Sequence, residues 1–167
     1  MNLPYRNTVK HNKKFNLNLN YQYKQKKFDL KPRGFWYQIK NYLFKWGEFD
    51  WGNYIYEVKI KTNRLTNFNQ KDKNKILVIR DIDDLIKFDK KYGIKCSNMG
   101  FISWSNVENN YGGIEIKNYE KILKDIGKIK NYDDKYTWFL SIDFSSGCIW
   151  NLDIVREINY FGKAQDD

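Results

Sequence analysis

The run KPRGFWYQIKNYLFKWGEFDWG, from Lys31 to Gly52, is the densest aromatic stretch of the chain. Side chains of this size bury large areas, so the run has to form core or the floor of a binding site. A Pro-Arg-Gly turn sets the direction in which the chain enters it. We expect a short buried strand over Gly34–Tyr37 and an amphipathic helix over Gln38–Trp46. The aromatic residues of the run are Phe35, Trp36, Tyr37, Tyr42, Phe44, Trp46, Phe49 and Trp51.

The positive charge of the chain is concentrated near its N-terminus. The whole chain carries a formal net charge of +10 in 167 residues, and residues 1–46 hold 11 Lys and Arg against a single acid, Asp29. A basic face beside a neutral body suits a phosphate-bearing partner, whether a nucleotide, a nucleic acid or an anionic surface. The alternative is a solvated lysine face enlarged by AT-rich codon usage.

Length and composition favour one folded domain over residues 1–167, with a basic quarter at 1–46 and a frayed acidic tail at 165–167. The fraction of hydrophobic residues, 41%, argues against disorder although the mean hydropathy is −0.79. Cys96, Cys148 and His11 are too few for a zinc site made of four Cys and His ligands, so we expect no metal.

The residue patterns predict short strands between short helices. The first strands are expected over Asn2–Thr8 and, from alternating apolar residues, over His11–Phe28. Asn53–Thr62 has the clearest alternation of all. The remaining predicted strands are Lys75–Arg80, Ile114–Ile116, Trp138–Asp143 and Cys148–Trp150.

Helices are expected from Asp81 through Tyr92, over Ser103–Asn109 and over Asn118–Lys130, with one further helix in the tail from Asn151. Asp81, Asp83 and Asp84 fit the start of a helix, where acids are favoured, better than a metal site. Ile94–Phe101 is predicted to be irregular. Without a β-α-β-α rhythm, the pattern indicates an α+β fold with a curved, mostly antiparallel sheet.

Three segments carry a resemblance to a known family. KPRGFWYQ from Lys31, YGGIEI from Tyr111 and SSGCIWN from Ser145 resemble, in that order, the K-P-x-G-L-W-Y-S, Y-D-G-I-E-I and S-G-C-I-W-N segments of an uncharacterised family of bacterial, phage and giant-virus proteins. The resemblance runs from about Tyr5 to Trp150. That family in turn resembles the ADP-ribosyltransferase fold. This resemblance implies that the curved sheet is split into two parts.

The resemblance implies an enzyme that uses NAD, either to modify a macromolecule or to hydrolyse NAD itself. ADP-ribosyltransferases stabilise the oxocarbenium-like ribose with a glutamate on a late strand, a role that falls to Glu115. Arg6 falls at the first-strand position that holds NAD, and Tyr37, with Trp36, would stack on nicotinamide. Gln38 stands where the family has serine and can hydrogen-bond an amide.

The residues themselves leave alternatives open. Glu115 lies between Ile114 and Ile116, so on a half-exposed strand it would simply point to water. Cys148 could act as a nucleophile with His11 as the base, or be a small buried residue in a tight turn, which the pattern favours. Asp143 is a candidate second acid.

A non-enzymatic function is the main alternative. In the N-terminal quarter lysines interleave with aromatic residues, a mixture that suits single-stranded nucleic acid through phosphate neutralisation and base stacking. The chain would then be a nucleic-acid-binding accessory or virion protein. The residues concerned are Lys10, Lys13, Lys14, Lys24, Lys26 and Lys27 with Phe15, Tyr21, Tyr23 and Phe28.

The expected location follows from what the N-terminus lacks. MNLPYRNTVK has no apolar signal region, and no apolar run reaches membrane-spanning length. We therefore expect an intracellular protein with reduced thiols and no membrane partner. Frequent Lys, Asn and Ile are typical of an AT-rich genome such as that of a large virus, which predicts host cytoplasm or the virion.

Overall fold

A computed structural model describes residues 7–11, 17–39, 54–61, 63–96, 99–129 and 134–163. These residues form a sheet of eight strands in the order β10-β3-β1-β2-β9-β8-β5-β4, and a separate hairpin, β6-β7. The strands are β1 (Asn7–His11), β2 (Phe35–Ile39), β3 (Tyr54–Ile60), β4 (Leu65–Thr66), β5 (Asp72–Ile79), β6 (Gly93–Cys96), β7 (Met99–Ile102), β8 (Tyr111–Ile116), β9 (Ser146–Ile149) and β10 (Val155–Lys163). The helices are α1 (Ile82–Tyr92), α2 (Trp104–Glu108), α3 (Tyr119–Ile126) and α4 (Thr137–Leu140), with single 3-10 turns at Asp134–Tyr136 and Leu152–Ile154.

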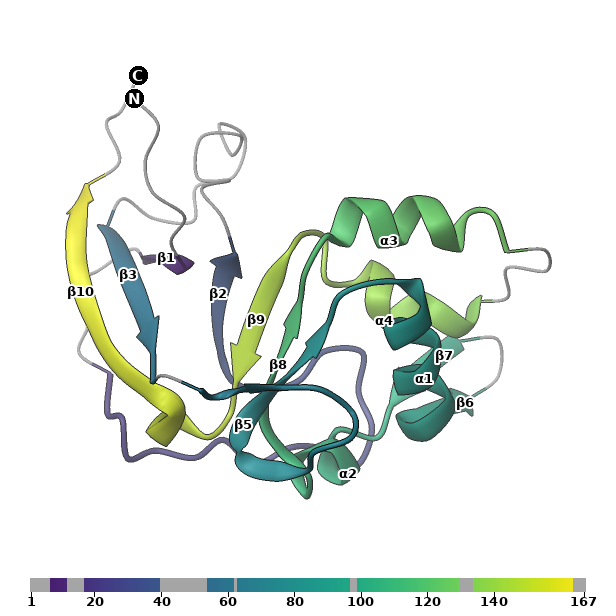
Figure 1. The fold of residues 1–167 in the computed structure, drawn as a ribbon, viewed down its shortest axis with the longest axis horizontal. Helices are drawn as coiled ribbons and strands as arrows, with labels where there is room; N and C mark the ends of the chain where they lie inside the picture. The colour runs from purple at the N-terminus through teal and green to yellow at the C-terminus, as the bar shows by residue number, and fades with distance from the viewer. Residues whose placement is uncertain are drawn as a thin grey trace.

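The large sheet is curved and mostly antiparallel, which confirms the α+β class predicted from the sequence. Only the pairs β4–β5 and β5–β8 are parallel among the strands described. The register of β10 against β3 shifts twice, and such irregularities increase the local twist of a sheet. In Figure 1 the helices α1, α3 and α4 gather beside the β5–β8 part, while β3 and β10 curve away on the other side.

The sheet has a hydrophobic core on each face. On the first, which we call the helix face, Ile114 and Cys148 pack against helix residues such as Phe88 and Trp138. On the second face, Tyr37 packs with the group Phe35, Ile39, Val58, Ile76, Ile149, Leu152, Ile154 and Val155. Alternation along each strand therefore decides which of the two cores a side chain enters.

The dense aromatic run was predicted correctly only in its first part. Phe35–Ile39 is a strand whose residues alternate between buried and half-buried, in agreement with the strand expected over Gly34–Tyr37. Gln38 and Ile39 belong to this strand, so the prediction that a helix begins at Gln38 is wrong. Ile39 is buried in the second-face core together with Phe35 and Tyr37, and an extended backbone places these three alternate residues on one face. Residues 40–46 lie outside the described residues.

Several elements confirm the sequence reasoning closely. The strand expected over Asn53–Thr62 is β3, and the helix expected from Asp81 is α1. The side chain of Asp81 accepts a hydrogen bond from the Asp84 backbone N–H at 2.9 Å, which confirms Asp81 as the N-cap, and Asp83 and Asp84 lie in the first turn of the helix. The predictions for α2 and α3 are also confirmed, although α3 ends earlier, at Ile126.

Three predictions in the second half of the chain are wrong. Residues 94–96 and 99–101 are not irregular but belong to the paired strands β6 and β7, while residues 97 and 98 lie outside the described residues. Residues 138–143 are not a strand, because the adjacent Trp138 and Phe139 are both buried in one core, which α4 allows and a one-sided strand does not. The tail is not a helix: after a short turn capped by Asn151, it pairs along β3 as β10.

The N-terminal strand predictions are partly corrected. The strand expected over Asn2–Thr8 is found as β1, which begins at Asn7; residues 2–6 lie outside the described residues. Of the strand expected over His11–Phe28, His11 ends β1, whereas residues 17–28 form no strand: they contain a turn closed by the Tyr21 N–H to Asn18 O hydrogen bond and one isolated bridge between Gln22 and Asn151. Their backbone groups bond to different elements in turn, so no single neighbouring strand supports them.

Candidate functional site

The three motif segments meet at one row of the large sheet. Tyr37 in β2 lies opposite Gly147 in β9, and Gly147 in turn lies opposite Glu115 in β8. Tyr37 reaches across the middle strand and donates a hydrogen bond from its hydroxyl to Glu115 Oε1 at 2.7 Å. The pair is buried, with Glu115 only 2% exposed. The segments that carry the family resemblance thus interact directly on the second face.

Gly147 is what allows this contact. A Cβ atom built at position 147 would overlap the ring and the hydroxyl of Tyr37. Any side chain there would therefore block the path from β2 to β8. The glycine of the SSGC segment lies within strand β9, and it is explained by packing of the Tyr37 ring over it rather than by backbone freedom.

The environment of Glu115 pulls its pKa in two directions. Burial raises the pKa, because the charged form loses its hydration. The hydrogen bond from Tyr37 and the positive charges of Lys117 and Arg80 oppose this rise but do not cancel it. The net effect is a pKa above the usual glutamate range, which brings protonation of Glu115 closer to neutral pH.

The second carboxylate oxygen of Glu115 faces a partly exposed lysine. Lys117 Nζ lies 3.7 Å from Oε2, within range of an ion pair but too long for a hydrogen bond. Oε2 has no hydrogen-bond partner in the described part of the chain. The Lys117 side chain is 34% exposed, so this cation lies between the buried carboxylate and solvent.

Tyr37 stays protonated and can only donate to Glu115. Its burial, and after that the negative charge of Glu115, raise its pKa well above the usual tyrosine value. A neutral phenol next to a carboxylate orients that carboxylate and stabilises its charge. Tyr37 therefore positions Glu115 and is not itself a base.

The other predicted site residues do not join this pair. Trp36 and Gln38 alternate with Tyr37 along β2, so they lie on the helix face, where Trp36 packs against the core and Gln38 lies opposite Ser146. Arg6 lies outside the described residues. The carboxylate and the tyrosine are thus brought together, while the tryptophan and glutamine are on the other side of the sheet.

Neither Cys148 nor Asp143 takes part in the Tyr37–Glu115 site. Cys148 is fully buried beside the Pro32 carbonyl, and burial raises the pKa of its thiol well above the usual value. The burial agrees with the structural role favoured from the sequence, since the reactive form is the thiolate, but Cys148 lies in strand β9 and not in a tight turn. Asp143 is exposed and pairs with Lys31 at 3.7 Å.

A cleft of about 410 Å³ opens away from Glu115, beside the first residues of β8. Its lining is polar and includes several side-chain amides, two lysines and aromatic rings. Glu115 and Tyr37 do not line it. The residues around it are Gln22, Tyr23, Lys24, Lys73, Asn74, Glu108, Asn109, Tyr111, Gly112, Trp150 and Asn151.

The described residues show neither a metal-binding cluster nor a membrane-spanning helix. Within them, no group of three or more Cys, His, Asp and Glu side chains is placed to hold a metal ion. None of their helices is long and apolar enough to cross a bilayer.

Sequence reasoning singled out Glu115 and Tyr37 but missed three neighbours. Lys117 and Arg80 supply the positive charge near the carboxylate, and Gly147 supplies the space. Only Lys117 had a signal in the sequence: it follows Glu115 by two positions, the spacing of residues that share one face of a strand. Arg80 reaches the site through the parallel pairing of β5 with β8, which the sequence did not indicate.

No protein-family model, curated protein or solved structure matches this chain. The interpretation of the site consequently depends on its own geometry and on the three motif segments.

Proposed function

We propose that this chain uses NAD as a substrate and breaks the bond between nicotinamide and ribose. The ADP-ribosyl group is passed to a macromolecule or to water. The observation that carries the proposal is the buried hydrogen bond between Tyr37 and Glu115, to which all three motif segments contribute. It supports the assignment of Glu115 as the carboxylate that stabilises positive charge on the ribose.

The chemistry needs a fixed anion next to the breaking bond. As the C1′–N bond breaks, its electron pair leaves with nicotinamide and positive charge develops on the ribose ring. The Glu115 carboxylate stabilises this charge, with Tyr37 holding its orientation. An oxygen nucleophile from water or the acceptor then forms the new bond at C1′ and loses its proton to solvent.

Lys117 has a defined part in this proposal. Because Glu115 is buried beneath it, NAD reaches the carboxylate only when the Lys117 side chain swings away. The Lys117 ammonium then leaves the Glu115 carboxylate and binds a phosphate oxygen of NAD. A direct hydrogen bond to phosphate is a stronger charge-assisted contact than the present 3.7 Å pair with Glu115. Arg6 remains the proposed N-terminal contact for phosphate or ribose.

The test is nicotinamide release from NAD, followed by chromatography, with and without a cell lysate as the source of acceptor. Glu115→Gln keeps the shape of the side chain and removes the charge, so release should fall by about 100-fold or more. Glu120→Gln, which makes the same change on the exposed side of α3, serves as the matched control. Release that depends on lysate identifies a transferase, and release without lysate a hydrolase.

The pH profile gives a second and independent readout. Glu115 has to be ionised to act, so release should increase with pH through its raised pKa. Lys117→Met removes a charge that favours ionisation and should move this increase to higher pH. Absence of nicotinamide release, together with no thermal stabilisation by NAD, would rule the proposed function out.

A further inference from the structure

Residues 17–34, which we call the strap, are held in place by contacts with several elements. The Tyr23 backbone N–H donates to Trp150 O at 2.8 Å, and the Ser105 N–H donates to Lys26 O at 3.0 Å. The Trp104 indole N–H donates to Asp29 O at 3.0 Å. In Figure 1 the strap runs along the bottom of the molecule, from below β10 toward α2. Its backbone is therefore ordered before any partner binds.

The outer side of the strap presents aromatic rings and cations together. Tyr21 is 52% exposed and Phe28 is 49% exposed, which is unusual for rings on a segment held this firmly. Between and beyond them the strap carries five Lys and Arg against one acid, Asp29. Exposed rings among cations are what a single-stranded nucleic acid requires: stacking for its bases and neutralisation for its phosphates.

Part of this charge is free for a ligand. Lys26 pairs with Asp29 at 2.9 Å and Lys31 with Asp143 at 3.7 Å, whereas Lys27 and Arg33 have no ion pair in the part of the chain described. Lys24 lies 3.6 Å from Glu108, but its side chain is 85% exposed, so that contact is weak.

The cleft of about 410 Å³ opens directly beside the strap. Strap residues Gln22, Tyr23 and Lys24 line it together with Lys73, at the start of β5. The volume is in the ordinary range for sites that hold small molecules. Glu108, the acid of the cleft, accepts a hydrogen bond from the Gln25 N–H at 3.1 Å, which ties its carboxylate to the strap.

We propose that the strap and the adjoining cleft bind single-stranded nucleic acid. One nucleotide enters the cleft, where side-chain amides meet the edge of its base. Its phosphate lies between Lys24 and Lys73, and the bases of neighbouring nucleotides stack on Tyr21 and Phe28. The proposal depends on the strap and cleft alone and holds whether or not the chain consumes NAD.

Binding should be sensitive to salt and tolerant of sequence. Fluorescence anisotropy of a labelled oligo(dT) or oligo(U) of about 12 nucleotides measures it on the full chain. If about three phosphates are neutralised, raising salt from about 50 mM to about 200 mM weakens binding about 20-fold. A duplex of the same length has no free bases to stack and should bind much more weakly. Equal binding of the duplex would overturn the proposal.

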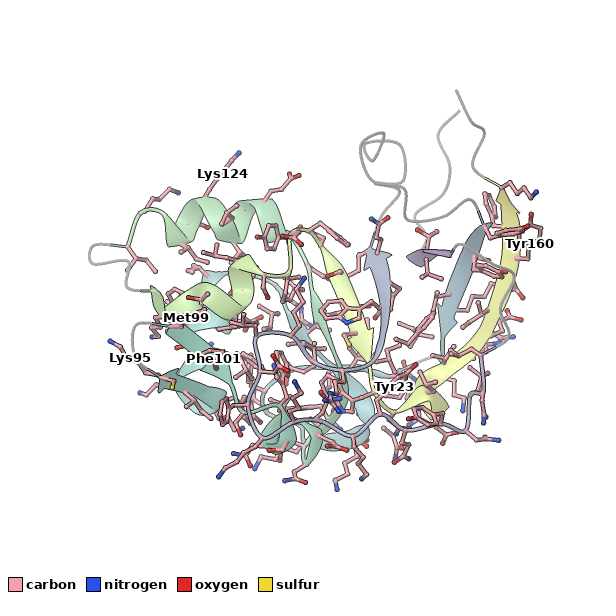
Figure 2. The ribbon with its side chains drawn as sticks, turned by 180° about the vertical axis from the view of Figure 1, so that it is seen from behind. Tyr23, Lys95, Met99, Phe101, Lys124 and Tyr160 are labelled. Atoms are coloured by element: carbon pink, nitrogen blue, oxygen red, sulfur yellow. The ribbon has the colours of Figure 1, made fainter. Side chains whose placement is uncertain are left out.

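Four variants separate this site from general attraction to a basic protein. Tyr21→Ala and Phe28→Ala should each weaken binding about fivefold or more through lost stacking. Lys73→Glu tests the cation that β5 contributes to the cleft, and Lys124→Glu makes the same charge change on α3, which Figure 2 shows far from Tyr23. If Lys124→Glu weakens binding as much as Lys73→Glu, or if polyglutamate competes as well as unlabelled oligonucleotide, the proposal is wrong.

Discussion

Replacing Tyr37 by phenylalanine removes one hydroxyl from the centre of the candidate site and leaves the ring. The ring keeps its place over Gly147 and in the second-face core. What is lost is the 2.7 Å hydrogen bond to Glu115 Oε1. In the described part of the chain Oε2 already has no hydrogen-bond partner, so the variant leaves a buried carboxyl group supported by the charge of Lys117 at 3.7 Å and by the more distant charge of Arg80.

The cost of Tyr37→Phe should depend on pH. When Glu115 is protonated, the lost bond joins two neutral groups and costs about 1 kcal/mol of the free energy of unfolding. When Glu115 is ionised, the acceptor is charged and the cost rises to about 2–3 kcal/mol. The hydroxyl favours the ionised form, so its removal raises the pKa of Glu115 further above the usual value.

The direction of the pH effect follows from proton binding. Between the ordinary glutamate pKa and the raised pKa of the folded state, the folded chain holds a proton on Glu115 that the unfolded chain has released. Stability therefore falls as pH increases through this window, and it falls further in Tyr37→Phe because the window is wider. Below the window both states are protonated, and only the smaller cost remains.

Urea unfolding of the wild-type chain and of Tyr37→Phe at about pH 4 and about pH 8 measures how the cost of the substitution depends on pH. In thermal unfolding, each kcal/mol lost should lower Tm by about 2–4 °C for a chain of this size. Tyr21→Phe removes the hydroxyl of an exposed tyrosine and should cost little at either pH. On a Glu115→Gln background, the pH dependence of the Tyr37→Phe cost should vanish. An equal cost at both pH values would refute the reasoning.

Gly147→Ala should destabilise the fold by about 1–3 kcal/mol in urea unfolding, because the added methyl group overlaps the Tyr37 ring. Gly127→Ala, whose nearest neighbours are 3.6 Å from the added carbon, should be close to neutral, and equal losses for the two would contradict the packing argument. A thiol reagent such as DTNB should label the exposed Cys96 rapidly in the folded chain and reach the buried Cys148 only in urea. Rapid labelling of both thiols in buffer would show that Cys148 is accessible.

The elements that the sequence predicted well are those whose signals are local. The helix α1 has an aspartate cap, an apolar stripe and a closing glycine within a single segment, and β3 alternates apolar and charged residues from Tyr56 to Ile60. Each of these patterns needs no knowledge of what the segment packs against. The row of acids at the start of α1 could be assigned for the same reason, since an N-cap is defined by its own backbone.

The elements that the sequence predicted wrongly depend on distant partners. Val155–Lys163 has an apolar pattern that suits a helix or a strand, and pairing with β3 decides for the strand. The strap alternates like a strand. Its backbone, however, hydrogen-bonds to Trp150, Ser105 and Ile102 in turn, which belong to different elements, so it does not pair with any one strand. Propensity is a weak guide where tertiary contacts compete with it.

The candidate site shows the same division. Position 115 could be recognised as a carboxylate between two apolar strand neighbours, but alternation alone does not say whether the carboxylate points to water or into a second core. That answer depends on the curvature of the sheet, which places a core on each face, and on Tyr37 from a strand 78 residues away. By contrast, the placement of Trp36 and Gln38 on the opposite face of the sheet from Tyr37 could be predicted from the sequence, because successive residues of a strand point to opposite faces.

The stability cost of the Tyr37–Glu115 pair is itself an argument for function. A buried carboxylate with one hydrogen bond and a distant cation does not recover the hydration that it loses, as its raised pKa shows. Its neighbours on the second face, among them Ile76 and Ile149, are apolar, so an apolar pair of similar volume would fit this core at least as stably. Stability therefore does not explain the acid, the tyrosine that orients it or the glycine that gives the tyrosine room, and this favours the proposed chemical role of Glu115.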